Sequence, residues 1–387
     1  MAVQTDERPD LVAIELWRLP IDFFALDAKS QWEAFASVIV PAKKLSKPRD
    51  PCKLSLQEDF LASSYFLTIL GLPLIVPIAT LTLLVKGSSF IKWWMLAVCL
   101  LVAHPIPAYL PWYRRNRIGV ILAKYFTMTL LIDRSHPEMK HVGTPAVEEN
   151  PVKAPLVPLA CPHGVLNFGA IIWVFFSRWI CGLEQYTAGA SIVSKVPGLR
   201  YLCASLWVIP ADRKSLKRAL QEPPRLEDKS GKRFSTDTPR RGGMVGVVPD
   251  GIAGIFKSKP GSDVLYIGAK RGLMRICLEE GALVAGSWFA GTPDLFRIVT
   301  DPFGILEFVS RKLQVSIFAF FGRWGSPIPR RIPLTMCSRL VRCEKVADPT
   351  PEQVQKTHED VYEGMARLYN EELCHYTGYP DRKLRIL

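Results

Sequence analysis

Residues 155–168 read PLVPLACPHGVLNF. The stretch begins as an apolar run, passes a proline and a glycine on either side of His163, and continues into a second apolar segment. Short apolar runs bounded by turn residues are typical of buried strands, and longer apolar segments are typical of helices. The sequence therefore predicts a strand, a turn shaped by Pro162 and Gly164, and a helix.

The same alternation recurs through the C-terminal part of the chain. Apolar runs that end near glycine or proline occupy residues 205–210, 244–249 and 282–289, and a helix-like pattern covers residues 263–281. A polar surface loop is expected over residues 221–241 and an amphipathic helix over residues 348–372. Together these patterns indicate an α/β domain, in which active residues commonly lie at strand ends.

Two apolar segments precede this domain. Residues 60–85 contain no charged residue, and as one helix they would run about 39 Å against a hydrocarbon core of about 30 Å. Pro73 and Pro77 should kink this helix. Residues 93–113 are also apolar, with Trp and Tyr near both ends as at a membrane interface. The short connection predicts a transmembrane helical hairpin; a pair of buried core helices and a hairpin that re-enters without crossing are the alternatives.

Charged flanks orient the predicted hairpin. Basic residues cluster within residues 43–53, and three arginines, the first of them Arg114, follow the second segment. Because positive charge favours the cytosolic side, both termini are expected there, and the N-terminus lacks the pattern of a cleavable signal. The expected divisions are a cytosolic, partly disordered arm at residues 1–58, a membrane hairpin at residues 59–113 and an α/β domain at residues 114–387.

The composition narrows the range of partners. Lys and Arg number 49 against 36 Asp and Glu, and the resulting net charge of +13 suits anionic lipid headgroups or phosphate-bearing substrates. The sequence has no zinc-finger spacing, RNP-like strand or basic heptad helix, so no nucleic-acid partner is expected. Nine scattered cysteines without a C-x-x-C pair predict reduced thiols facing the cytosol and no structural metal.

His163 is the strongest candidate for chemistry. An imidazole at a turn between a strand and a helix can act as a general base, and the amides at the start of the helix can hold an anion or an oxyanion. A histidine in such a turn can equally be a capping or packing residue. The other five histidines are weaker candidates, and the sequence contains neither a G-x-S-x-G elbow nor a phosphate-binding P-loop.

Several blocks follow one another in a recognisable order. They are PHG at residues 162–164, VVPDGIAGIF at 247–256, AKRGLMRICLEEGALV at 269–284, FGRWGSPIPRR at 321–331 and the C-terminal helix. This order resembles the type-2 diacylglycerol acyltransferase family, which includes monoacylglycerol and wax-ester acyltransferases. The resemblance implies a glycerolipid-acyltransferase-like domain whose central, mostly parallel or mixed sheet is flanked by helices. It also implies that His163, matching the second histidine of the family's His-Pro-His-Gly block, is catalytic.

The chain departs from the family pattern at four positions. Cys161 replaces the first histidine of that block, and Gly254 stands where the glycine-rich block usually ends in glutamate. Gly291 stands at the glutamate of a Phe-Gly-Glu block, and Asn167 where broader glycerolipid acyltransferases carry aspartate. Asp250 is a candidate replacement for a missing carboxylate. Asn167 can orient the imidazole or form hydrogen bonds at the helix surface.

Basic residues in two blocks are candidates for binding substrate. Lys270 and Arg271, before Gly272, resemble the start of the family's Arg-x-Gly-Phe block, and a guanidinium suits the phosphates of CoA. Arg323 belongs to a second basic stretch that can contact CoA or lipid headgroups. For both stretches the alternative is ordinary solvated surface charge.

The resemblance implies acyl transfer from acyl-CoA to diacylglycerol at the endoplasmic reticulum membrane and the lipid-droplet surface. His163 would take the hydroxyl proton, and amides of the turns that contain Pro162, Gly164, Asp250 and Gly251 would hold the oxyanion. Acyl-CoA, diacylglycerol and membrane lipid are the expected partners, and no metal or redox cofactor is expected because the thioester is already activated. The alternatives are monoacylglycerol, wax-ester or lysophospholipid acylation, an acyl-enzyme on Cys161, and a non-catalytic lipid-droplet scaffold. A homo-oligomer is possible.

Overall fold

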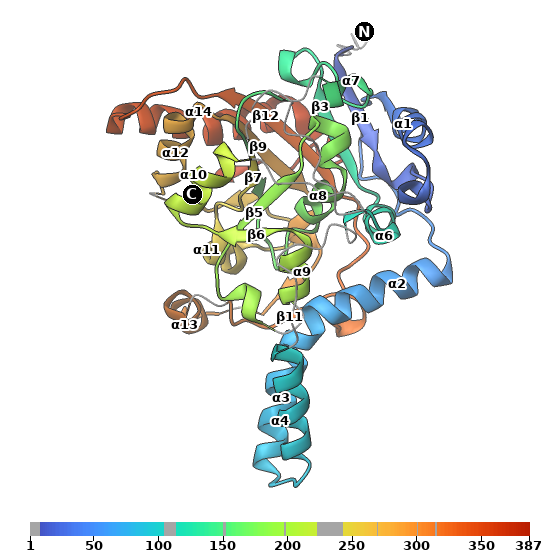
Figure 1. Ribbon diagram of the computed structural model, residues 1–387, viewed down its shortest axis with the longest axis vertical. Coiled ribbons are helices and arrows are strands. Elements are labelled where there is room, and N and C mark those ends of the chain that lie inside the picture. The colour runs from blue at the N-terminus through green and yellow to red at the C-terminus, as the bar shows by residue number, and fades with distance from the viewer. Residues whose placement is uncertain are drawn as a thin grey trace.

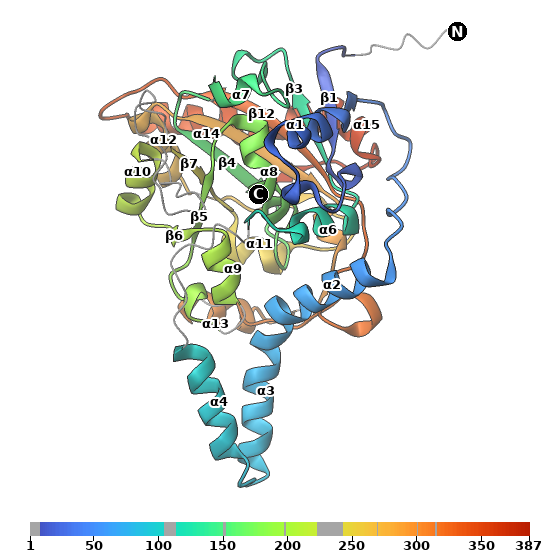
Figure 2. The ribbon, with the colours of Figure 1, turned by 45° about the vertical axis from the view of Figure 1, so that its right-hand side comes forward.

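A computed structural model describes residues 8–103, 114–149, 152–196, 199–222, 243–268, 270–299, 301–313 and 316–387. The end of the second apolar segment and most of the predicted surface loop lie outside these ranges. Within them, a central sheet is covered by helices, and one pair of helices projects from the domain (Figures 1 and 2).

A nine-stranded sheet forms the centre of the domain (Figure 1). Its strands are β1 (Leu11–Glu15), β2 (Ile39–Pro41), β3 (Thr129–Asp133), β4 (Leu156–Cys161), β5 (Gln185–Gly189), β6 (Val208–Pro210), β7 (Met244–Gly246), β9 (Leu283–Ala290) and β12 (Thr335–Arg342). They lie in the order β2-β1-β3-β12-β9-β4-β7-β5-β6. Neighbours from β9 to β6 are parallel, whereas β12 is antiparallel to β9, and β1 is antiparallel to β2 and β3. The expected α/β fold is confirmed, with a mixed sheet.

Helices cover both faces of this sheet. The helices of the domain are α1 (Ala28–Ser37), α6 (Arg117–Tyr125), α7 (Ala146–Glu149), α8 (Phe168–Cys181), α9 (Leu199–Ser205), α10 (Arg213–Gln221), α11 (Gly251–Lys257), α12 (Gly272–Glu280), α13 (Ile305–Leu313), α14 (Pro351–Leu368) and α15 (Cys374–Thr377). One core contains α6 and α8, and the other contains α10, α12 and α14. Every residue of β4 and β9 is buried, as expected for strands covered on both faces.

The predicted C-terminal amphipathic helix is confirmed as α14. Thr350 and Gln353 form a capping box at its start. Val354, Val361 and Met365 are buried against the sheet, at the spacing of one helix face.

Residues 8–58 belong to the domain and do not form a solvated arm. β1 pairs with β3 along its whole length and with β2 at its other edge. Arg49 Nη2 lies 3.0 Å from Glu15 Oε1, and Arg49 Nη1 donates to Thr129 Oγ1 at 2.7 Å. The expectation of a partly disordered arm is therefore wrong for residues 8–58, because strand pairing and specific polar contacts attach this segment to the sheet.

The long apolar segment is helical from Leu56 to Val85, but only its second half projects. It comprises α2 (Leu56–Phe66), a π-helical turn (Leu67–Gly71) and α3 (Leu72–Val85), and α4 (Ile91–Ala103) follows it. α2 lies along the base of the domain, whereas α3 and α4 project together (Figures 1 and 2). Phe66 is fully buried against Phe126 and Phe168. α2 therefore packs on the domain, and α3 is the part of the predicted span that projects from it.

The bend between α2 and α3 lies at the π-helical turn. There the Leu72 N–H bonds the Leu67 carbonyl, and Pro73 follows at once. A proline removes a donor and crowds the preceding turn, so the predicted kink near Pro73 is confirmed. One helix of the described chain, Leu56–Val85, is long and apolar enough to span a membrane, whereas α4 is shorter. The projecting α3 has 14 residues, about 21 Å, and is thus shorter than a hydrocarbon core of about 30 Å.

Arg114 is a structural residue, not a solvated charge that flanks a membrane segment. It donates to the carbonyls of Ser205 and Gln185 at 2.9 and 2.6 Å and pairs with Glu184 at 3.1 Å. Its guanidinium lies 3.8 Å from the ring centroid of Trp207. Burial lowers the pKa of Arg114 to about 10, although Glu184 opposes this shift. Arg114 is therefore not a surface charge, and the orientation of the hairpin stays a prediction.

The helix-like pattern over residues 263–281 is helical only in its second part, α12. Its first part contains β8 (Val264–Leu265), which pairs in parallel with β13 (Arg385–Ile386). Between β8 and α12, Gly268 has a φ of +55°, a left-handed conformation that interrupts a helix. The prediction of one helix here is wrong because strand pairing with the C-terminus takes the first residues.

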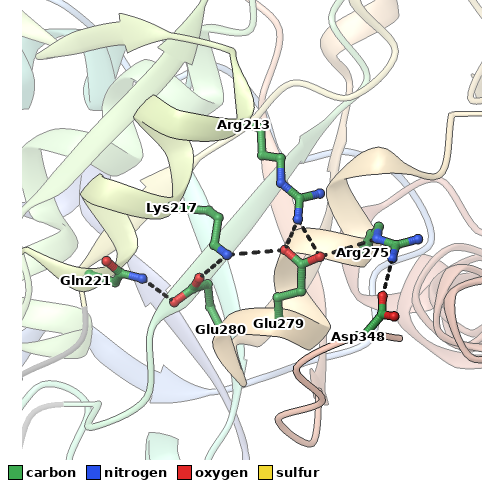
Figure 3. Close-up of polar contacts among 7 residues, drawn as sticks. All are labelled: Arg213, Lys217, Gln221, Arg275, Glu279, Glu280 and Asp348. Atoms are coloured by element: carbon green, nitrogen blue, oxygen red, sulfur yellow. Dashed lines mark hydrogen bonds and ion pairs between the residues drawn. The ribbon is translucent and has the colours of Figure 1, made fainter. Parts of the chain in front are cut away.

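A cluster of charges joins α10 to α12 (Figure 3). Arg213 donates to both carboxylate oxygens of Glu279 at 2.6 and 2.7 Å, and Lys217 lies 3.4 Å from the same carboxylate. The Glu279 side chain is only 5% exposed. Burial alone would raise the pKa of Glu279, but the hydrogen bonds and positive charges of Arg213 and Lys217 outweigh burial, and the pKa is lowered.

We expect this cluster to make the fold sensitive to acid. The pKa of Glu279 is lowered in the folded chain. Its contribution to the stability of the fold is therefore fully present above its ordinary pKa of about 4.3 and is lost as the pH falls through the lower folded value. Glu279→Gln should lower the Tm at pH 7 and flatten the fall of Tm below a pH of about 4. Glu222→Gln is the control, since its pair with Arg218 is exposed. Parallel Tm curves for Glu279→Gln and the unmodified chain would contradict this expectation.

Candidate active site

His163 lies in the turn between β4 and α8, at the carboxyl end of the parallel strands. The predicted strand, turn and helix are confirmed. Gly164 has a φ of +57°, which glycine adopts readily, and a Cβ at this position would lie 3.1 Å from Thr292 Cγ2. Pro162 and Gly164 therefore shape the turn, and Thr292 packs against it. Sequence patterns did not indicate Thr292.

The imidazole of His163 is oriented by the next residue. Nδ1 lies 3.0 Å from the Gly164 carbonyl oxygen. A carbonyl oxygen can only accept, so in the neutral ring the proton is on Nδ1. Nε2 is then the basic nitrogen. The residue is partly exposed and lines a cavity.

Asp250 connects the end of β7 to this turn. Its Oδ2 accepts from the His163 main-chain N–H at 2.9 Å. The residue is fully buried, and its Oδ1 has no hydrogen-bond partner in the part of the chain that the structure describes. Burial raises the pKa of Asp250, and the nearby His163 opposes that shift. A carboxylate from the neighbouring strand thus holds the main chain of His163.

The two glycines that replace family glutamates occupy crowded positions. A Cβ at Gly254 would lie 2.1 Å from Asp250 Oδ2, so the Asp250 carboxylate fills the space of a side chain at 254. Gly291 has a φ of +92°, and a Cβ there would lie 2.6 Å from the Pro333 carbonyl oxygen. Asp250 therefore supplies a carboxylate beside His163 where Gly254 cannot.

Asn167 closes the turn and caps α8. Its Nδ2 donates to the Pro162 carbonyl at 2.8 Å, and its Oδ1 accepts from the Ala170 N–H at 2.9 Å. The bond from Ala170 is that of a helix N-cap, and the bond to Pro162 closes the preceding turn. The residue is buried, and both ends of its amide are engaged with the main chain. Of the two roles expected for Asn167, the geometry matches hydrogen bonding at the helix start.

Lys270 lies at the turn that contains Asp250 and Gly251. Its Nζ donates to the carbonyl oxygens of Pro249 and Asp250 at 3.2 and 3.1 Å. Burial lowers the pKa of Lys270, whereas Asp250 opposes this shift. Gly251 begins α11 with a φ of +55°. The structure therefore brings Lys270, Asp250 and Gly251 together beside His163.

Arg271 faces α14 and not this turn. Its Nε donates to Gln355 Oε1 at 2.6 Å, and its Nη1 lies 2.7 Å from His358 Nε2. Burial, together with the charge of Arg271, lowers the pKa of His358 to about 4, so the neutral ring accepts this hydrogen bond. Arg271, Gly272 and Gln355 line a groove of about 570 Å³ between α12 and α14.

Arg323 is engaged with α2. Its Nη1 donates to Asp59 Oδ1 at 2.8 Å, and its guanidinium lies 4.1 Å from the ring centroid of Trp324. Burial alone would lower the pKa of Arg323, but hydrogen bonds with Asp59 and Tyr125 outweigh it and the pKa is raised. Arg323 thus joins the loop after β11 (Phe320–Phe321) to the base of the apolar helices.

An apolar cavity of about 110 Å³ lies beside His163, between the sheet and α8. Small side chains leave this space, notably Ala160 on β4 and Ala285 and Ser287 on β9. They line one wall because alternate residues of neighbouring strands face the same side of a sheet. Among sequence patterns, only the small residues at alternate positions in two apolar runs point to this cavity.

Cys161 belongs to the opposite core, with α12 and α14. Its thiol is fully buried, and burial raises its pKa well above the ordinary value. Nucleophilic cysteines are instead partly exposed and have a lowered pKa. The geometry therefore does not favour an acyl-enzyme on Cys161.

A metal site is not evident among the described residues, where no group of three or more His, Cys, Asp or Glu side chains could hold an ion. The nine cysteines are free thiols. That the reaction needs no metal or redox cofactor stays a prediction.

An α/β domain that presents a basic imidazole nitrogen at an apolar cavity is suited to acyl transfer between lipids. A model of the diacylglycerol acyltransferase family matches residues 109–386. The chain therefore belongs to this family, which confirms the resemblance seen in the sequence. The protein is thus an acyltransferase by class.

The names of three relatives refer to three different acyl acceptors. The chain is 24% identical to mouse diacylglycerol O-acyltransferase 2-like protein 6 over 59% of this chain and 69% of the relative. It is 26% identical to bovine 2-acylglycerol O-acyltransferase 1 over 58% and 67%. Mouse acyl-CoA wax alcohol acyltransferase 1 is 22% identical over 58% and 69%. No solved structure matches the chain significantly.

We expect Gly254→Ala to disturb His163 through Asp250. The added Cβ would lie 2.1 Å from Oδ2 and displace the carboxylate from the His163 N–H. A hydrogen bond to a charged group contributes about 1.5–3 kcal/mol, so acyl transfer should fall by about tenfold or more. Initial rates in purified membranes, normalised to the amount of folded protein, measure this.

Gly71→Ala is the matched control, since its nearest neighbours would lie 3.7 Å away in ordinary contact. Asp250→Gly combined with Gly254→Glu moves the carboxylate from one residue to the other. This double variant should transfer acyl groups faster than Gly254→Ala. A Gly254→Ala rate equal to that of the Gly71→Ala control would contradict the role assigned to Asp250.

Proposed function

We propose that the protein is an acyl-CoA-dependent O-acyltransferase that makes triacylglycerol from diacylglycerol. The observation that carries this proposal is His163 beside an apolar cavity, with Nδ1 held by the Gly164 carbonyl and Nε2 left basic. Family membership supports acyl transfer to a glycerolipid. The relatives named for 2-acylglycerol and wax alcohol make monoacylglycerol and fatty alcohol the alternative acceptors.

The proposed reaction is direct transfer without an acyl-enzyme. His163 Nε2 takes the proton from the acceptor hydroxyl, whose oxygen attacks the thioester carbonyl of acyl-CoA. The new C–O bond forms and the C–S bond breaks, and the proton passes to the thiolate so that CoA leaves as a thiol. Amides of the turns around Gly164 and Gly251 are proposed to hold the oxyanion. Asp250 holds the main chain of His163 and is a positioning residue.

The donor is proposed to contact two separate parts of the domain. The part of its acyl chain next to the thioester is proposed to enter the apolar cavity of about 110 Å³ beside His163. Its phosphates fit the groove lined by Arg271 and Gly272, with Lys270 between the groove and the His163 turn. Arg323, which is paired with Asp59, is a weaker candidate for this task.

α3 and α4 are proposed to hold the domain in the endoplasmic reticulum membrane. The described residues before α2 and after Arg114 form one domain, so they lie on one side, proposed to be the cytosol where acyl-CoA is present. α3 is only about 21 Å long, which favours a hairpin that re-enters over one that crosses. A hairpin confined to one leaflet also suits the monolayer of a lipid droplet.

We expect His163→Gln to abolish acyl transfer while the fold persists. General bases contribute roughly 10²–10⁴-fold to rate, and glutamine cannot accept the proton. Membranes supplied with labelled acyl-CoA and diacylglycerol measure triacylglycerol formation. Cys161→Ser is the matched control and should keep substantial activity, because Cys161 is buried on the other face of the sheet.

The same assay with monoacylglycerol, fatty alcohol or lysophospholipid as acceptor distinguishes the alternatives. Product from lysophospholipid alone would contradict the proposed acceptor. Loss of activity in Cys161→Ser together with a trapped thioester would favour the acyl-enzyme. An unmodified chain that restores no triacylglycerol in a host without neutral-lipid synthesis would favour the scaffold.

We expect the cavity to select the length of the acyl chain. Ala285→Leu adds volume to the cavity wall and should shift the preference toward shorter acyl-CoAs, with a change in the ratio of kcat/KM values of about tenfold. Val284→Leu is the control, since Val284 is buried in the opposite core. Identical chain-length profiles for both variants would contradict the assignment of the cavity to the acyl chain.

A further inference from the structure

One surface of the domain exposes a set of large apolar side chains. They are Val299, Phe303, Ile305, Phe308, Ile317, Phe321 and Trp324, which are between 41% and 85% exposed. We call this set the basal apolar surface. Single exposed apolar residues are common, but several that come from one helix and the loops around it mark an interaction site.

Helix α13 turns its apolar side outward. Ile305 and Phe308, three residues apart, are 60% and 66% exposed. Ser310 is fully buried, and its Oγ accepts from the Ile317 N–H at 2.8 Å. A surface helix of a water-soluble domain has the opposite arrangement, with its apolar stripe toward the core. An outward apolar face with a buried serine suits a helix that faces lipid.

The basal apolar surface lies at the end of the domain from which α3 and α4 project. α13 lies near the level at which α3 leaves the domain in both views, which differ by a rotation about the vertical axis (Figures 1 and 2). Trp324 follows Arg323, whose guanidinium pairs with Asp59 on α2 at 2.8 Å. The surface is therefore next to the base of the apolar helices.

Basic residues border these apolar side chains. Arg311 and Lys312 on α13 are exposed, as is Arg297 on β10 (Arg297–Ile298). Arg311 pairs with Glu307 on the same helix at 2.6 Å. Exposed Trp and Phe side chains bordered by Lys and Arg are typical of helices that lie in the headgroup region of a membrane with anionic lipids.

We infer that the basal apolar surface inserts into the boundary between headgroups and acyl chains of the membrane, as a contact separate from α3 and α4. α13 packs against α11, and α11 begins directly after Asp250. The membrane contact is therefore one helix away from the His163 turn, and an apolar acceptor that leaves the membrane here crosses little water. This inference goes beyond the proposed reaction, because it concerns how the domain meets the lipid.

Lipid-dependent quenching of a fluorophore on α13 tests the inference. The full chain carries Cys52→Ser and Cys99→Ser, since the other seven cysteines are buried. Phe308→Cys is labelled with nitrobenzoxadiazole and reconstituted into vesicles of phosphatidylcholine and phosphatidylserine that contain nitroxide lipids. Lys356→Cys, exposed on α14 at the opposite end of the domain, is the matched control (Figure 1). Quenching at position 308 should be several-fold stronger than at position 356.

Equal quenching at the two positions overturns the inference. So does emission at position 308 that shifts to the blue with protein concentration but is not quenched by nitroxide lipid, because the surface then contacts a second copy of the chain. If Phe308→Cys does not fold, Phe303→Cys, 85% exposed in the native chain, provides the same test. The measurement needs no acyl transfer, so its result is independent of the proposed function.

Discussion

The hydrogen bond from the His163 N–H to Asp250 Oδ2 sets the geometry of the site. It joins the ends of β4 and β7, which are parallel neighbours in the sheet although 87 residues separate the two partners. The carboxylate is fully buried, so water cannot replace His163 as its partner without opening the core. Lys270 binds the main chain of the same turn through two carbonyls. The position of the imidazole therefore depends on the register of the parallel strands.

In the proposed site, main-chain groups and Asp250 stand in for the missing family carboxylates. The Gly164 carbonyl orients the imidazole and selects its tautomer, a task that an aspartate or glutamate performs in many catalytic histidine sites. A carbonyl does not carry the full negative charge that stabilises an imidazolium. Asp250 supplies a carboxyl group at the His163 main-chain N–H, in space that Gly254 leaves open. Asn167 is left to cap α8.

The apolar helices and the site share one core. Phe66 at the end of α2 packs against Phe168, the first residue of α8, and α8 forms one wall of the cavity beside His163. The same core contains Ala285 of the cavity wall. One close-packed core therefore connects α2 with the wall of the cavity. The chain changes direction between α2 and α3 at the π-helical turn.

The sequence alone predicts the strand, turn and helix around His163, the strands at 244–249 and 282–289, and helix α14, because apolar periodicity, turn residues and caps act within a few residues. The order of its motifs also indicates the family. The folded structure is needed to see that Asp250 reaches His163, that Ala160 and Ser287 share a cavity, and that strands within residues 8–58 join the sheet. It also decided that Arg114 is buried and that α2 packs on the domain. These features depend on strand register and on contacts between residues far apart in the chain, which local patterns do not encode.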